Sequence, residues 1–332
     1  MQRFFDSCGE GFVQLQRFVV WVIAVSVLLL GAGAVSGQKY PIKPIRIVTS
    51  EAGGGNDLQA RLIAQGLTRA LGEQVIVENR PSGIIPGEIV SKAQPNGYTL
   101  LLYNNALWTG PLIQKTPYDA VKDFSPIVAV AKAANILVVN PALPIHSVAE
   151  LIALAKAKPG ELNYGSSGTG ASNHLAGELF RSMAEINIVR INYKGAGPAL
   201  TALLAGELQL MFPTAGAVAP HIRTGRVRML AVTSAEPSAL APGIPTMAAS
   251  GLPGYESISI YGVFAPARTP RTLIDKLNQE IVRFLNRADI KEKFFNAGME
   301  TMGGSPEQLA ATVKSEIAKL GKVIKQAGIR SE

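Results

Sequence analysis

One pattern occurs twice in this chain: a short apolar segment runs through a glycine-rich loop into an amphipathic stretch. The first copy covers residues 47–61, with three consecutive glycines at 53–55, and the second covers residues 162–180. Glycine permits tight turns, and a helix that begins after the turn presents free N–H groups and the positive end of its dipole. The pattern predicts two strand–loop–helix units, with Asn56 or Asp57 as the helix N-cap in the first.

Predicted strands and helices alternate on both sides of a long apolar stretch at 124–140. Such alternation favours an α/β protein whose sheets are mainly parallel and flanked by helices. The stretch at 124–140 is expected to cross from one α/β series to the other, and a strand at 255–264 is expected to return. We therefore predict one domain from residues 37–139 plus 255–332 and a second from residues 140–254, joined by two crossover strands.

The first 36 residues have a different character. Arg3 and Arg17 precede an apolar run at 18–30, and small residues follow it up to Ser36. This order is typical of a secretory signal peptide cleaved after Ala34 or Ser36, and the run is shorter than the roughly 20 residues of a membrane span. A retained membrane anchor is the alternative. The sequence therefore predicts an exported, periplasmic protein.

Cysteine and charge narrow the chemistry further. The single cysteine, Cys8, lies in the predicted signal peptide, so the exported protein is expected to have neither disulfides nor thiol chemistry. The net charge is +8, but the basic residues are scattered and form no dense stripe. We expect no nucleic-acid partner, and a small anionic ligand accounts for the charge more simply.

The two loops supply most of the candidate ligand-binding residues. Ligands of α/β sheets bind at the carboxyl ends of parallel strands, so both loops are expected to face one cleft. The candidates in the first loop are Ser50, Glu51, Gly53, Gly54, Gly55, Asn56 and Asp57. Those in the second are Ser166, Ser167, Thr169 and Gly170, and four more follow strands or begin helices: Asn104, His174, Lys194 and Gly195. Asn105, next to Asn104, is a further plausible amide contact. The alternatives are a capped turn for the second loop, a packed helix residue for His174 and a solvated side chain for Lys194.

Catalytic and cofactor motifs are not matched. The second loop lacks the last glycine of G-x-S-x-G, neither loop gives G-x-G-x-x-G, and there is no G-x-x-x-x-G-K-[ST]. The three histidines are far apart in sequence, so we predict no metal site and no cofactor. An exported serine hydrolase, with His174 as a base, is kept as the least favoured alternative.

Taken together, the motifs resemble the extracytoplasmic solute receptors of tripartite tricarboxylate transporters, the Bug receptors. The resemblance runs over nearly all of the chain after the signal peptide. It rests on residues 52–61, 77–81, 96–101, 164–170, 174–178, 193–195, 245–246 and 251–254. It implies a type II-like, two-domain periplasmic binding protein that closes around a small carboxylate. It also implies that Gly53 to Asp57, Ser166, Ser167, Thr169 and Gly170 hold the carboxylate through backbone groups, hydroxyls and water.

Three departures from the family pattern affect ligand identity. Ser50, Glu51 and Ala52 stand where the family usually has an apolar pair and proline, and residues 82–86 replace a small, glycine-rich loop. Pro213 replaces an aspartate that often faces an amino-bearing ligand, whereas Glu51 could restore a negative charge nearby. We therefore expect a monomeric, non-catalytic periplasmic receptor that passes a small organic carboxylate to the membrane subunits of a transporter. A sensor that signals to a membrane partner would have the same cleft.

Overall fold

The computed structural model describes residues 40–329 except 82, 168–169 and 194. The predicted signal peptide therefore lies outside the described residues. Contacts divide the chain into a unit up to Ile42 and a unit from Lys43 onward. Of the first unit the structure describes only residues 40–42, where the Tyr40–Pro41 peptide bond is cis. Everything below concerns the second unit.

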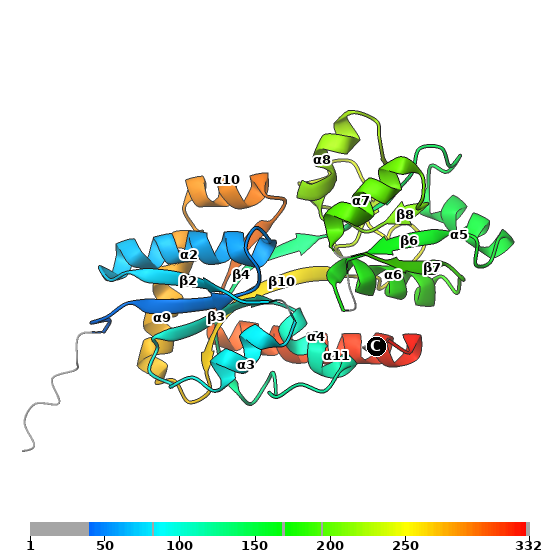
Figure 1. Ribbon diagram of the computed structural model, residues 1–332. Helices are drawn as coiled ribbons and strands as arrows, with labels where there is room; N and C mark the ends of the chain where they lie inside the picture. The colour runs from blue at the N-terminus through cyan, green and yellow to red at the C-terminus, as the bar shows by residue number, and fades with distance from the viewer. Residues whose placement is uncertain (1–39, 82, 168–169, 194, 330–332) are drawn as a thin grey trace, which may run out of the picture. The chain divides into compact units, whose positions relative to one another are not determined.

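The second unit contains two sheets, of which the first has six strands in the order β11-β4-β10-β3-β1-β2 (Figure 1). Its strands are β1 (Ile45–Thr49), β2 (Val75–Asn79), β3 (Thr99–Asn104), β4 (Phe124–Ala134), β10 (Ile258–Pro266) and β11 (Glu300–Gly303). β1 is parallel to both of its neighbours, β2 and β3. β10 is antiparallel to β3 and β4, and β11 is antiparallel to β4. We call this sheet and the helices packed on it the first lobe.

In the described part of the chain, six helices flank the first sheet. They are α2 (Gly55–Leu71), α3 (Ile85–Ser91), α4 (Ala106–Ile113), α9 (Arg271–Leu285), α10 (Ala288–Asn296) and α11 (Pro306–Ala327). α2 lies on one face, while α3, α4 and α11 lie on the other, over a core that includes Trp108 and Phe264 (Figure 1). Trp108 is fully buried and packs edge-on against Phe264, so it belongs to the core and not to a pocket wall.

The second sheet has five strands in the order β7-β6-β8-β5-β9. Its strands are β5 (Ile136–Val139), β6 (Asn163–Ser166), β7 (Val189–Asn192), β8 (Leu210–Met211) and β9 (Arg228–Val232). Its helices are α5 (Val148–Ala157), α6 (Ser172–Met183), α7 (Ala196–Ala205) and α8 (Ala215–Arg223). β6 is parallel to β7 and β8, whereas β5 is antiparallel to β8 and β9. This sheet and its helices form the second lobe.

The two-lobed α/β class is as predicted, but the sheets are mixed instead of mainly parallel. The reason is the crossover between the lobes, because a strand that leaves one sheet and a strand that returns must run in opposite directions. β4 leaves the first sheet and β10 re-enters beside it, antiparallel over Phe124–Ala134. β11, which was not predicted, adds a further antiparallel strand.

The predicted crossover at 124–140 is divided at Asn135, between β4 in the first sheet and β5 in the second. Backbone and hydroxyl hydrogen bonds join Asn135 to Thr233, and the N–H of Ser257 donates to the carbonyl of Thr233 at 2.9 Å. The outgoing and returning segments are thus held together where they pass between the lobes. The assignment of every residue to one of two domains stays a prediction.

Other contacts also join the lobes. On one side, Leu320 and Ile324 of α11 cluster with Leu175 of α6. On another side, the turn at Gly298, after α10, meets the first turn of α8. A Cβ added at Gly298 would lie 2.3 Å from the nitrogen of Gly216, so the two backbones touch.

Candidate functional site

The first glycine loop connects β1 to α2, and its helix begins earlier than predicted. Gly54 is the N-cap of α2, so Asn56 and Asp57 lie inside the first turn and neither of them caps it. Gly53 has φ +86°, a left-handed conformation that favours glycine. The helix starts early because the Asp57 carboxylate reaches back and accepts a hydrogen bond from the N–H of Gly53 at 2.9 Å.

Asp57 is fully used in holding this loop in place. Besides Gly53, its carboxylate accepts hydrogen bonds from Asn79 at 2.8 Å and from Arg61 at 3.1 Å. Burial of the Asp57 carboxyl opposes ionisation, but the donors from Arg61, Gly53 and Asn79 outweigh it and lower its pKa. Asp57 therefore fixes the loop and is turned away from the space between the lobes.

The second glycine loop connects β6 to α6, and its inner residues are also held by the protein. Ser166 is fully buried, and its Oγ accepts a hydrogen bond from Arg190 Nε at 2.8 Å. The hydroxyl of Ser167 donates to Asn173 Oδ1 at 3.0 Å. Thr169 lies outside the described residues, as does Lys194. The loop is therefore tied to β7 by Arg190 and to α6 by Asn173.

His174 has the same supporting role. Its Nδ1 accepts a hydrogen bond from the N–H of Gly170 at 3.0 Å, and the residue is 2% exposed. Burial, with the nearby charge of Arg190 as a smaller contribution, lowers the pKa of His174 to about 4. The ring is therefore neutral near pH 7 and can accept this hydrogen bond. Neither Ser166 nor Ser167 hydrogen-bonds to His174 in the described part of the chain, so a serine–histidine pair is not assembled there.

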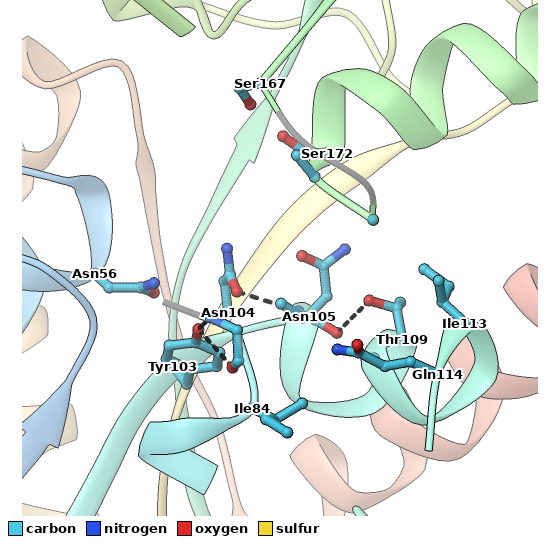
Figure 2. Close-up of a pocket in the computed structure, with 15 residues that line it drawn as sticks. Asn56, Ile84, Tyr103, Asn104, Asn105, Thr109, Ile113, Gln114, Ser167 and Ser172 are labelled. Atoms are coloured by element: carbon cyan, nitrogen blue, oxygen red, sulfur yellow. Dashed lines mark hydrogen bonds between the residues drawn. The ribbon is translucent and has the colours of Figure 1, made fainter. Parts of the chain in front are cut away.

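A cavity of about 280 Å³ lies between the lobes, bounded by these two loops and by α4 (Figure 2). Figure 2 shows Asn56, Asn104 and Asn105 on one side and Ser167 and Ser172 on the other. The lining residues are Asn56, Gly83, Ile84, Tyr103, Asn104, Asn105, Ala106, Thr109, Gly110, Ile113, Gln114, Ser167, Gly170, Ala171 and Ser172. The lobes touch at its edge, since a Cβ added at Gly170 would lie 2.9 Å from Ile113 Cδ1.

The cavity brings together only some of the predicted site residues. Asn56, Asn104, Ser167 and Gly170 line it. Gly53, Gly54 and Gly55 line a different cavity of about 270 Å³, with Thr214 and the turn at Ala297 to Met299. The remaining described candidates line neither of these two cavities; they are Ser50, Glu51, Asp57, Ser166, His174 and Gly195. Ser50 accepts from Asn56 Nδ2 at 3.0 Å, and Gly195 is the N-cap of α7.

Several lining residues were not among the predicted ones. α4 contributes Thr109 and Ile113 to the wall, and its C-cap contributes Gln114; this helix was not predicted at all. Tyr103 and Asn105 lie at the carboxyl end of β3, where ligand contacts are expected in an α/β sheet. The end of a predicted strand was the available signal: it had indicated both Asn104 and Asn105 as amide contacts, and only Tyr103 was not expected there.

The electrostatics of the cavity come from amides, hydroxyls and helix ends. Its described lining contains no Lys, Arg, His, Asp or Glu side chain. Residues at the N-terminal ends of α2, α4 and α6 converge on it, and each such end carries a partial positive charge. Tyr103 stays protonated, because burial raises its pKa to about 12. The arrangement suits an anion that also makes hydrogen bonds.

The described residues contain no group of three or more His, Cys, Asp or Glu side chains that could hold a metal ion. Within that same part of the chain, no helix has the length and apolar character needed to cross a membrane.

Comparison with known proteins gives a consistent picture. The family model described as "Tripartite tricarboxylate transporter family receptor" matches residues 59–329. The protein BugT of Bordetella pertussis is 34% identical over 316 residues, covering 93% of this chain and 97% of BugT. The solved structure of R. palustris Rpa4515 with adipate has a TM-score of 0.79 at 35% identity, covering 88% of this chain and 99% of that one. The periplasmic binding protein BugD has a TM-score of 0.76 at 31% identity, covering 88% and 100%.

Proposed function

The chain belongs to the tripartite tricarboxylate transporter receptor family, and on that premise we propose that it captures a small organic carboxylate between its two lobes. The observation that carries the proposal is the cavity lined by amides and hydroxyls from both lobes, where the N-terminal ends of α4 and α6 converge. Hydrogen bonds to a charged group contribute about 1.5–3 kcal/mol each, so a few of them reach the roughly −8 kcal/mol of a micromolar ligand. The family is one of substrate-binding receptors, and we propose no catalytic step.

The proposed mechanism is hinge closure. A carboxylate that contacts Ser172 and the start of α6 on one lobe, and Asn104 on the other, stabilises the arrangement in which both lobes line the cavity. A ligand shifts such an equilibrium only by its differential affinity for the two arrangements. The crossover at Asn135 and Thr233, where the two connecting segments are joined, is the natural place for the rotation.

The cellular setting follows from the family and from the N-terminal sequence. The predicted signal peptide at residues 1–36 directs export of the receptor and is then cleaved off. The mature receptor acts as a monomer in the periplasm. It then presents its closed form to the membrane subunits of a tripartite transporter. Neighbouring genes that encode such subunits would support uptake, whereas a neighbouring sensor kinase would support signalling.

The proposal is tested by calorimetric titration of the purified protein with mono-, di- and tricarboxylates. We expect at least one acid to bind with a Kd near or below the micromolar range. Ser172→Ala should weaken that binding, since Ser172 lines the cavity at the start of α6 (Figure 2). Ser182→Ala is the matched control, because it makes the same change on the same helix but outside the cavity lining. Failure of every acid to bind would refute the proposed function.

A further inference from the structure

The hydrogen-bonding capacity of two consecutive asparagines gives more detail about the ligand. Asn104 Oδ1 accepts from the N–H of Ala106 at 3.1 Å, and Asn105 Nδ2 donates to the carbonyl of Ile258 at 3.4 Å. A backbone N–H can only donate and a carbonyl oxygen can only accept, so these partners fix the orientation of both amides. Asn104 therefore has its NH₂ group left over, and Asn105 has its amide oxygen left over.

Both leftover groups face the cavity. Figure 2 shows the side chains of Asn104 and Asn105 extending from the start of α4 into the space below Ser172. No described residue pairs with Asn104 Nδ2 or Asn105 Oδ1, and Asn105 is only 5% exposed. The same wall contains a second acceptor without a partner among the described residues, Asn56 Oδ1, in a side chain that is 8% exposed. Asn56 Oδ1 is buried within the protein, whereas Asn105 Oδ1 is open to the cavity. A ligand that displaces water from Asn105 Oδ1 must therefore supply a donor, because an acceptor left without one is costly.

A carboxylate cannot meet this demand by itself. Its oxygens only accept, so they pair with Asn104 Nδ2 but leave Asn105 Oδ1 unpaired. An ammonium group only donates, so it pairs with Asn105 Oδ1 but cannot accept from Asn104 Nδ2. A hydroxyl group satisfies both amides, since it accepts from one and donates to the other.

We propose that the preferred ligand is a hydroxy acid whose hydroxyl accepts from Asn104 Nδ2 and donates to Asn105 Oδ1, while its carboxylate lies at Ser172 and the start of α6. This inference rests on the proposed function and specifies the ligand of the same cavity. The hydroxyl gains two hydrogen bonds, and the unsubstituted acid leaves the cavity-facing oxygen of Asn105 without a donor. Because the hydroxylated acid gains both of these bonds, the preference should be about tenfold or more.

The test is calorimetric titration of the protein with acids matched in carbon skeleton and charge: lactate against propionate, malate against succinate, and citrate against tricarballylate. In every pair that binds, we expect the hydroxylated acid to bind about tenfold more tightly. Succinamate, whose carboxamide also both donates and accepts, is an additional arm. Tighter binding of succinamate than of malate would overturn the assignment to a hydroxyl.

Variants locate the effect. Asn105→Leu keeps the side-chain size but removes the acceptor, so the hydroxyl preference should fall to about twofold or less while the unsubstituted acid keeps its affinity. Asn105→Ser, which restores a small acceptor, is the second variant should the leucine variant not fold. Asn286→Leu, the same change at an exposed residue after α9, should retain the full preference.

The outcomes separate this inference from the proposed function. Equal affinities within each pair, or an unchanged preference in Asn105→Leu, would overturn the hydroxy-acid inference and leave carboxylate binding intact. If no acid in the panel binds, the proposed function fails, and the present inference fails with it.

Discussion

The contact between Gly298 and Gly216 predicts that the hinge depends on two glycines outside the lining of the ligand cavity. A Cβ at Gly298 would lie 2.3 Å from Gly216 N and 2.7 Å from Gly216 Cα, well inside normal contact distance. The backbone of α8 cannot yield locally, so Gly298→Ala must move one lobe by about 1 Å relative to the other. Because the arrangement described here has both lobes lining the cavity, this movement should weaken ligand binding.

The free-energy cost of Gly298→Ala has two contributions. Gly298 has φ +76°, and a left-handed conformation costs an alanine about 1–2 kcal/mol. Overpacking costs a further 1–3 kcal/mol or so, and we expect the hinge to absorb that part. Gly72→Ala is the matched control for the first contribution: Gly72 also follows a helix, has φ +75° and has nothing within 4 Å of its added Cβ.

The assay combines urea denaturation with calorimetric titration of the tightest acid. Both variants should lose about 1–2 kcal/mol of stability, but only Gly298→Ala should lose affinity, by roughly 5- to 150-fold. Gly216→Ala approaches the same contact from the second lobe and should behave alike. Its control is Gly197→Ala, also at the second position of a helix but with open space around the added Cβ. Unchanged affinity with an extra 1–3 kcal/mol loss of stability in Gly298→Ala would refute the hinge reasoning.

Three further predictions concern the supports of the loops. The His174 pKa is about 4 in the folded state and about 6.5 when unfolded. The contribution of neutral His174 to folding stability is therefore fully present above pH 6.5 and is lost as the pH falls towards 4. The loss should be about 3 kcal/mol in all. Urea denaturation across this range should show the loss in the wild-type protein and not in His174→Asn, which keeps an acceptor for Gly170. Tyr164→Phe removes a 2.6 Å hydrogen bond to the buried Glu178 and should lower the free energy of unfolding by about 1.5–3 kcal/mol, whereas the same change at Tyr193 should have little effect. Glu51→Ala should change the ranking of acids in the titration panel but leave stability within about 0.5 kcal/mol, because Glu51 is exposed; an unaltered ranking would show that Glu51 has no part in ligand choice.

Elements with local signals could be predicted from the sequence. The residue types alone predict Gly72 as the end of α2, and it ends that helix in a left-handed conformation. They likewise predict Ser305 with Pro306 as the start of α11, which begins with a capping box. Ser147 with Glu150 predicts a capping box at the start of α5; Ser147 caps the helix, but the Glu150 carboxylate accepts from the N–H of His146 instead of that of Ser147. These features depend on residues at most four positions apart, so the sequence contains them directly.

α4 could not be predicted because its sequence has no helical signal. Residues 106–113 are almost uniformly apolar, contain Pro111 and lack a side-chain cap, so no polar face alternates with an apolar one. The helix forms because Leu107 and Trp108 are buried in the core of the first lobe. Tertiary packing outweighs local propensity here. Because α4 was not predicted, Thr109, Ile113 and Gln114 were not expected in the cavity wall either.

The two glycine loops could be predicted from the sequence, but the directions in which their side chains point could not. In both loops the residue types that suit an anion also suit the loop's own backbone. Asp57 is used by Gly53, Ser166 by Arg190, and His174 by Gly170. The partner of Ser166 comes from a distant strand, and the partners of Asp57 and His174 lie in turns whose geometry cannot be predicted from the sequence. What remains for the ligand is what the fold leaves unpaired, such as the NH₂ of Asn104 and the amide oxygen of Asn105, and only an account of every hydrogen bond identifies those groups.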